Sequence, residues 1–177
     1  MRRRRGEAGY ILFYPLLLLA VFGVLASSCL PRYTAWYHQA VLTYEAERLA
    51  GELRLLQQAS RTATVRLEAG ETMSARRPEL RCDYQERSYC LWRPQRNAAG
   101  EVRSGTFRVH RLSPGVRLQA LDAAAQSRIS FGFNGGTVTP MSFRFTYDGD
   151  AAAVKYVVVH SGGRIRVGDR WEKNVDF

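Results

Sequence analysis

Residues 10–29 read YILFYPLLLLAVFGVLASSC, a stretch of twenty residues in which no side chain is charged. A helix of this length matches the hydrocarbon core of a bilayer, which is about 30 Å thick. Four arginines precede the stretch at positions 2–5, and no basic cluster directly follows it. Because basic residues are retained on the cytoplasmic side, we expect a single-pass membrane helix with a cytoplasmic N-terminus and the rest of the chain beyond the membrane.

The helical pattern continues past the apolar stretch. Small and apolar residues recur at steps of three and four positions, at Leu42, Ala46, Leu49, Leu53, Leu56, Ser60 and Ala63. This spacing places them on one face of a helix. Pro31 can be accommodated as a kink. The sequence therefore predicts one long helix from Tyr10 to about Ala63, with an apolar half, residues 10–30, and an amphipathic half, residues 31–61.

Three kinds of N-terminal signal fit a basic leader followed by an apolar stretch. An ordinary secretory signal is disfavoured because the stretch is long and lacks a clear cleavage site. A lipoprotein signal would use Leu25–Cys29 as its lipobox and acylate Cys29, but a flexible polar tether usually follows such a cysteine. A prepilin leader, residues 1–9, would be cleaved after Gly9 and leave the apolar helix on a chain that begins at Tyr10. The continuing helix favours this third interpretation.

The composition bounds the rest of the chain. Its formal charge of +10 comes from 24 arginines and only two lysines, Lys155 and Lys173, against 16 acidic residues. A surface of this sign favours polyanions or anionic lipid head groups as partners. Residues 62–177 are enough for one small β-rich domain. We therefore predict an α+β fold in which the long N-terminal helix packs on a C-terminal antiparallel β-sheet domain.

Alternation of polar and apolar residues predicts the strands of this domain. They are Thr62–Glu68, Thr106–Arg111, Val116–Ala120, Arg128–Phe133, Ser142–Tyr147, Lys155–His160 and Arg164–Val167. The last two are joined by a tight turn at Ser161-Gly162-Gly163, and Ser113-Pro114-Gly115 lies between the second and third.

Residues 76–96 carry six arginines and three aromatic rings, and we interpret them as a solvated insertion loop. The alternative is an exposed binding loop whose rings stack on bases while its arginines contact phosphates. Cys82 and Cys90 lie in this segment. In an oxidising compartment they are the natural disulfide pair, a cross-link worth about 2 kcal/mol. No CxxC spacing occurs, so zinc or thioredoxin-like chemistry has no support.

With these elements in place, the chain resembles the GspH/FimT family of type IV pilin-like proteins. Counted from Tyr10 as the first mature residue, Pro31 falls where pilins commonly carry a helix-kinking proline. Residues 129–135, ISFGFNG, resemble the family's I-x-F-x-P-x-G segment, and residues 155–167, KYVVVHSGGRIRV, resemble its VVVS-x-x-GRVRV hairpin. The resemblance implies a pilin-like fold, cleavage at Gly9 by a prepilin peptidase, and assembly with other pilins into a filament.

One residue departs from the pilin pattern. Pilins generally have glutamate at the fifth mature position, where this chain has Tyr14 followed by Pro15. In the family that carboxylate is thought to pair with the N-terminal amine of a neighbouring subunit, since an unpaired charge among apolar helices is costly. Its absence favours a subunit at or near the filament tip over one along the shaft.

The predicted binding site is the last hairpin. Arg164 and Arg166 point to the same side of a strand, about 7 Å apart, a spacing close to that of successive phosphates. In the FimT branch of the family a GRxR motif is implicated in DNA binding, and residues 163–166 read GRIR. Gly163 would let the backbone approach the ligand closely. Lys155, Arg170 and Lys173 could extend the basic track. The alternative is a strand edge with two solvated arginines, which also discourages aggregation.

Catalysis has little support in the sequence. His38, His110 and His160 are isolated from cysteines and paired acids, and we expect structural or surface roles for them. No P-loop, GxSxG or HExxH pattern occurs, so we expect neither an enzyme nor a bound cofactor or metal.

The function expected is that of a minor pilin of the GspH/FimT type at or near the tip of a type IV pilus, which binds extracellular DNA for uptake or primes pilus assembly. It would reside in the inner membrane with a periplasmic domain, and outside the cell once assembled. The alternatives are a structural GspH-like pseudopilin of type II secretion and a lipid-anchored periplasmic protein.

Overall fold

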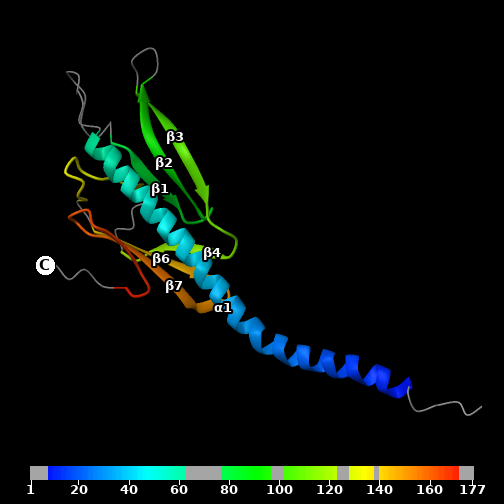
Figure 1. The fold of residues 1–177 in the computed structure, drawn as a ribbon. Helices are drawn as coiled ribbons and strands as arrows, with labels where there is room; N and C mark the ends of the chain where they lie inside the picture. Colours follow the sequence, from blue (N-terminus) through cyan, green and yellow to red (C-terminus); the bar gives the residue numbers. More distant parts are fainter. Residues whose placement is uncertain (1–7, 63–76, 97–101, 123–127, 138–139, 172–177) are drawn as a thin grey trace, which may run out of the picture. The chain divides into compact units, whose positions relative to one another are not determined.

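The computed structural model of this chain describes residues 8–62, 77–96, 102–122, 128–137 and 140–171 (Figure 1). One helix is followed by eight strands within these residues. Their bounds are α1 Ala8–Thr62, β1 Glu79–Asp83, β2 Ser88–Arg96, β3 Val102–Arg111, β4 Val116–Ala120, β5 Arg128–Ile129, β6 Met141–Tyr147, β7 Asp150–Val159 and β8 Ile165–Gly168. The prediction of one long N-terminal helix before a β domain is confirmed. The predicted strand Thr62–Glu68 lies outside the described residues, except for Thr62, which ends α1.

The chain forms two compact units, Met1–His38 and Gln39–Phe177. In the first unit α1 passes through Pro15 and Pro31 without ending. Its apolar side chains from Phe13 onwards are exposed. By length and composition this helix is able to cross a membrane.

In the second unit α1 buries one face. Its buried side chains follow the predicted steps of three and four positions, at Leu42, Ala46, Leu49, Leu53 and Leu56. Together with the inward side chains of the strands they form one hydrophobic core. The large rings Phe131, Phe143 and Phe145 are each at most 1% exposed and fill its centre. Burial of this apolar face holds the helix to the domain.

The strands form two antiparallel sheets of four strands each. The first sheet has the order β3-β2-β1-β5, and the second has the order β4-β6-β7-β8. β8 is therefore an edge strand of the second sheet. The predicted turn Ser113-Pro114-Gly115 lies between β3 and β4, as expected, and these two strands belong to different sheets. The turn carries the chain from one sheet to the other.

Two further expectations need correction. Residues 76–96 are not an insertion loop, because β1 and β2 pair from Glu79↔Trp92 to Asp83↔Ser88 and form a hairpin. The six arginines of residues 76–96 concealed this alternation in the sequence. The predicted strand Arg128–Phe133 is reduced to the two residues of β5, after which the chain turns at Phe133-Asn134.

Two buried glutamates of α1 bind β3 and the turn that follows it. Glu45 is fully buried, and its Oε2 lies 2.8 Å from Nε2 of His110. Its other oxygen accepts hydrogen bonds from the backbone N–H and the hydroxyl of Ser113, at 3.0 and 2.5 Å. Two turns further along the helix, Glu52 Oε1 accepts a hydrogen bond from Nη1 of Arg108 at 3.1 Å. His110 therefore has the structural role that was expected for it.

Candidate functional site

The β7–β8 hairpin, which contains the predicted site, turns tightly at its tip. The backbone N–H of Gly163 donates to the carbonyl of His160 at 2.8 Å, and the N–H of His160 donates to the carbonyl of Arg164 at 2.9 Å. In the strands beyond, Val159 pairs with Ile165 and Val158 pairs with Arg166. This register fixes which side chains of β8 face the core.

The two sides of the hairpin differ in chemistry. Val157 and Val159 of β7 are fully buried, and Ile165 and Val167 of β8 pack against the same core. Arg166 pairs with Val158 on the opposite side, which we call the outer face. Arg164 lies two positions before Arg166, directly before β8, and both residues are exposed. The expectation that the two arginines share one face stays a prediction, because the register includes Arg166 but not Arg164.

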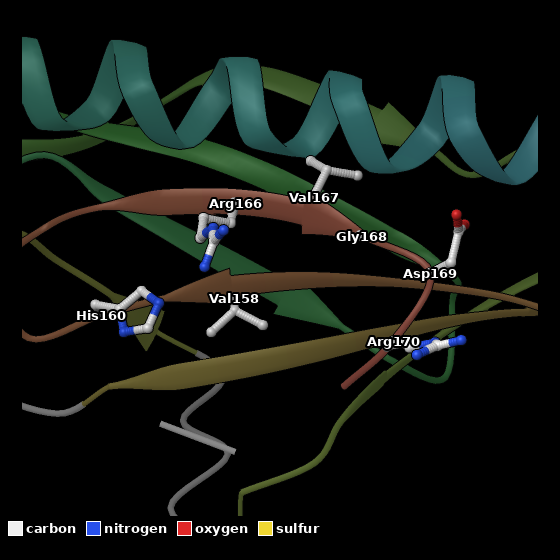
Figure 2. Close-up of a pocket in the computed structure, with 7 residues that line it drawn as sticks. All are labelled: Val158, His160, Arg166, Val167, Gly168, Asp169 and Arg170. Atoms are coloured by element: carbon white, nitrogen blue, oxygen red, sulfur yellow. The ribbon is translucent and has the colours of Figure 1, made fainter. Parts of the chain in front are cut away.

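A hollow of about 300 Å³ adjoins the arginines (Figure 2). Its lining comes from β7, β8 and the residues after β8, namely Val158, His160, Arg166, Val167, Gly168, Asp169 and Arg170. In Figure 2 Arg166 and Val158 lie on one side of the strands, whereas Val167 points towards α1. Arg170 is exposed at the other end of the hollow. The lining of the hollow includes two guanidinium groups and one imidazole, which suit anionic oxygen atoms, and one carboxylate, Asp169, which is paired with Lys155.

Further arginines lie on the outer face of the second sheet. Arg144 of β6 pairs with Tyr156 of β7 and with Gln119 of β4, so it has the same sense as Arg166. Arg117 of β4 also lies on this face and forms an ion pair with Asp148. Arg144 was not among the predicted site residues, although its position between Phe143 and Phe145 already placed it opposite the core.

Lys155 does not extend the basic track. It is three positions from Val158 along β7 and pairs with Phe145, so its side chain belongs to the side of the sheet that faces the core. Its side chain is only 15% exposed and forms an ion pair with Asp169. The prediction failed because it counted charge without applying the alternation of the strand. Lys173, the last member of the predicted track, lies outside the described residues.

The reason that position 163 requires a glycine differs from the predicted one. It is buried, has a φ of 83°, and a Cβ at this position would collide with the carbonyl oxygen of Gly135. The side-chain amide of Gln57 on α1 donates to the carbonyls of both Gly135 and Gly163, at 2.6 and 2.8 Å. The close approach that glycine allows is therefore between two turns of the protein itself, and the prediction that it serves a ligand is wrong.

The predicted disulfide is also wrong. Cys82 and Cys90 are both free thiols in this structure. In the β1–β2 hairpin Cys82 pairs with Tyr89, and Cys90 pairs with Arg81. Neighbouring residues of a strand point to opposite faces, so Cys82 faces the core with Tyr89 while Cys90 lies on the other face with Arg81. Spacing along the sequence could not reveal this difference in side.

The three rings of residues 76–96 do not form an exposed stacking platform. Tyr89 is 2% exposed, and its ring lies 5.0 Å from that of His110. Tyr84 packs against the core. Trp92 is partly exposed, and the guanidinium of Arg81 covers its ring at 4.7 Å from the ring centre. The alternative reading of this segment as a base-stacking loop is therefore wrong, and the outer face of the β7–β8 hairpin remains the candidate site.

The leader-cleavage residues, Gly9 and Tyr10, lie in the first turns of α1. They stay a prediction, as does the choice between prepilin cleavage and acylation of Cys29. Among the described residues, no three His, Cys, Asp or Glu side chains gather into a possible metal site.

The sequence matches one family model, and the fold is similar to that of solved structures. Residues 45–163, more than half of the chain, match the family model described as type II transport protein GspH. The minor pseudopilin EpsH of the Vibrio cholerae type 2 secretion system has a similar structure, with a TM-score of 0.50 and 14% identity over 71% of this chain and 94% of that one. The type IV minor pilin FimU of Pseudomonas aeruginosa gives a TM-score of 0.45 and 18% identity over 71% of this chain and 90% of that one. Comparison with curated proteins gave no match.

Proposed function

This chain belongs to the family of the type II transport protein GspH, and from that premise we propose that it is a minor pilin that binds DNA through the outer face of its β7–β8 hairpin. Membership makes the chain a minor pilin or pseudopilin with the pilin-like α+β fold. The proposal adds the ligand and the surface that holds it.

One observation carries the proposal. Arg166 of the edge strand β8 and Arg164, which directly precedes β8, are both exposed, and Arg166 lines a hollow together with His160 and Arg170. Side chains two positions apart in a strand are separated by about 7 Å, so the pair can contact neighbouring phosphates of one strand. Within the part of the chain that the structure describes, β8 is the last strand of its sheet, and we propose that an extended polyanion lies along this edge. Contacts of this kind bind the phosphate backbone and do not read the base sequence.

We place the subunit at or near the tip of a type IV pilus, anchored in the inner membrane before assembly and exposed outside the cell afterwards. The support is Tyr14, which offers no carboxylate to pair with a neighbouring subunit's N-terminal amine. A missing acid is tolerated most easily where the neighbouring subunit is also missing.

Arginine substitutions test the proposed DNA site. The full chain in neutral detergent micelles would be titrated onto a fluorescently labelled duplex, with anisotropy measured at several salt concentrations. Replacing Arg164 and Arg166 with alanine should remove two phosphate contacts. The slope of log affinity against log salt should then fall by about 2, with a loss of affinity of tenfold or more at low salt.

The matched control removes the same charge from another sheet. Arg111→Ala with Arg128→Ala takes two exposed arginines from β3 and β5 of the first sheet. For this control, the slope of log affinity against log salt should stay close to that of the unsubstituted chain. An equal loss in both double variants would mean that the net charge of the chain binds DNA, and an unchanged slope after loss of Arg164 and Arg166 would refute the site.

A second candidate function is that of a structural pseudopilin of type II secretion. It is favoured by the description of the matching family as a type II transport protein. Deletion of the gene separates the two, because a pilus subunit for DNA uptake is needed for transformation, whereas a secretion subunit is needed for export of enzymes.

A further inference from the structure

Aromatic rings lie at both ends of the apolar part of α1. Phe13 and Tyr14 lie at one end, 59% and 65% exposed. Tyr33, Trp36 and Tyr37 lie at the other end, 62%, 66% and 48% exposed. The last three are spaced by three and four residues, so they lie on one side of the helix, and the rings of Tyr33 and Trp36 are 6.3 Å apart. The helix therefore carries two exposed aromatic groups.

The segment between these groups suits hydrocarbon. Residues 15–31 contain no charged side chain. Their two hydroxyls, on Ser27 and Ser28, both donate to the carbonyl of Val24, at 2.8 and 2.9 Å. A polar group that faces lipid must be satisfied inside its own segment, and these two are. Arg32 follows directly, at a position from which a long basic side chain can reach the head groups.

The separation of the groups matches a bilayer. Tyr14 and Tyr33 are nineteen residues apart in a continuous helix. At 1.5 Å per residue this is about 29 Å, close to the ~30 Å thickness of the hydrocarbon core. Tryptophan and tyrosine are enriched where the hydrocarbon meets the head groups on either side of a membrane. Trp36 and Tyr37 lie within about 6 Å of Tyr33 along the helix, which is within the depth of one head-group layer.

We propose that α1 is held at a defined depth in a lipid bilayer, with Tyr14 at one head-group layer and Tyr33, Trp36 and Tyr37 at the other. The proposal rests on the membrane anchoring in the proposed function and is independent of DNA binding. It moves the lipid-embedded segment from residues 10–30, as the charge pattern predicts, to residues 15–32. It also assigns a role to Tyr14, which contacts lipid head groups instead of a neighbouring subunit.

Fluorescence quenching by brominated lipids tests the depth. The full chain would be reconstituted into vesicles of phosphatidylcholine and phosphatidylglycerol, with bromine placed either near the head group or near the end of the acyl chain. Trp92→Phe and Trp171→Phe leave Trp36 as the single tryptophan. Its emission should be shifted to shorter wavelength than in water and should lose more intensity with the shallow bromines than with the deep ones.

A matched variant supplies the deep reference. Val24→Trp with Trp36→Phe in the same background places the ring ten residues after Tyr14 and nine before Tyr33, and its emission should lose more intensity with the deep bromines. Tyr14→Trp with Trp36→Phe should behave like Trp36. If a background substitution unfolds the domain, the difference between the native chain and its Trp36→Phe variant gives the same signal.

Two results would overturn the proposal, and they are distinguishable. If the ring at position 24 is quenched but Trp36 emits as in water, the helix is embedded and the aromatic group is not at the head groups. It would then be free to contact neighbouring subunits. If neither position is quenched, the helix does not enter the bilayer, and the membrane anchoring in the proposed function fails as well.

Discussion

Position 163 requires a glycine for a reason that does not involve the residues next to it in the sequence. Its φ of 83° is one that side chains rarely adopt, and the carbonyl of Gly135 occupies the space of a Cβ. Arg164, directly after it, is exposed. In the sequence the two residues read as one motif, but in the structure the first is part of the core packing and the second is at the surface.

Replacing Gly163 with alanine should therefore destabilise the domain. The strained φ and the collision with Gly135 together should lower the free energy of unfolding by more than about 2 kcal/mol. Gly162→Ala is the matched control, since Gly162 is exposed and a Cβ there meets nothing within 4 Å. It should change stability by less than about 0.5 kcal/mol. Urea denaturation followed by circular dichroism measures both, and equal stability of the two variants would contradict the packing described.

Cys82 gives a second prediction at this scale. Burial raises the pKa of its thiol from 9.0 to about 12. A raised folded-state pKa means that the stability from this group is complete below pH 9.0 and is lost as the pH rises towards about 12. Burial also raises the pKa of Tyr84 and Tyr89, which adds to the loss in the same direction.

The free energy of unfolding should accordingly fall over this alkaline range, as measured by urea denaturation at a series of pH values. The free energy of unfolding of the Cys82→Ala variant should fall less steeply with pH, because this variant keeps the buried tyrosines but lacks the buried thiol. The same slope in the two proteins would show that Cys82 is not buried as the β1–β2 register requires.

At the scale of elements, α1 is fixed to β3 by polar bonds as well as by its apolar face. Glu45 is buried beneath the start of the domain and satisfies His110 and both donors of Ser113. At the other end of the helix Gln57 joins two turns of the second unit. These bonds determine the position of the helix along its own axis, which apolar packing alone leaves less well defined.

Loss of the Glu45 carboxylate should be costly. Glu45→Ala would leave the half-buried donors of Ser113 and the half-buried imidazole of His110 without this partner, which should lower the free energy of unfolding by about 3 kcal/mol or more. Glu47→Ala, an exposed glutamate on the next residue but one, should change it by less than about 0.5 kcal/mol. Thermal and urea denaturation of both variants measures the difference. Similar losses would mean that net charge, and not the buried contacts, sets the effect.

The elements also show what the sequence can and cannot predict. The period of α1 and the strands β4, β6, β7 and β8 were predictable, because apolar residues recur at regular steps and glycine-rich turns separate them. β1 and β2 were missed, since the six arginines of residues 76–96 gave the segment the composition of a loop. The place of Arg164 and Arg166 on one face stays a prediction from alternation alone. The burial of Gly163 depends on Gly135 and Gln57, which are distant in sequence, so no local pattern could indicate it. The side of Lys155, in contrast, could be predicted from alternation with Val157.

On the scale of the whole molecule, the buried side chains among the described residues belong to the unit Gln39–Phe177. The first of them along the chain is Leu42. The unit Met1–His38 adds none to this core, since its described apolar side chains are exposed. The two units therefore differ: the domain buries its apolar side chains in its own core, whereas the helix that precedes it exposes apolar side chains that fit a membrane anchor.

A chain that begins at Gln39 should consequently fold without detergent. Its thermal transition, followed by circular dichroism, should be cooperative, with a midpoint within a few degrees of that of the full chain in micelles, because no core contact is removed. A chain that begins at Gln57 is the control, since it lacks the buried face from Leu42 to Leu56, and it should show no cooperative transition. A non-cooperative Gln39 chain would contradict the division into two units.

The contact between Gly163 and Gly135 has a consequence for recognising DNA-binding relatives. Any protein that folds its two turns together in this way requires a glycine at the position of Gly163, whether or not it binds nucleic acid. The glycine of a GRxR motif is then a marker of the fold and carries no information about the ligand. Under the proposed function the two arginines after it are the positions that contact the polyanion, so a search that scores the four positions equally also selects chains that share only the fold.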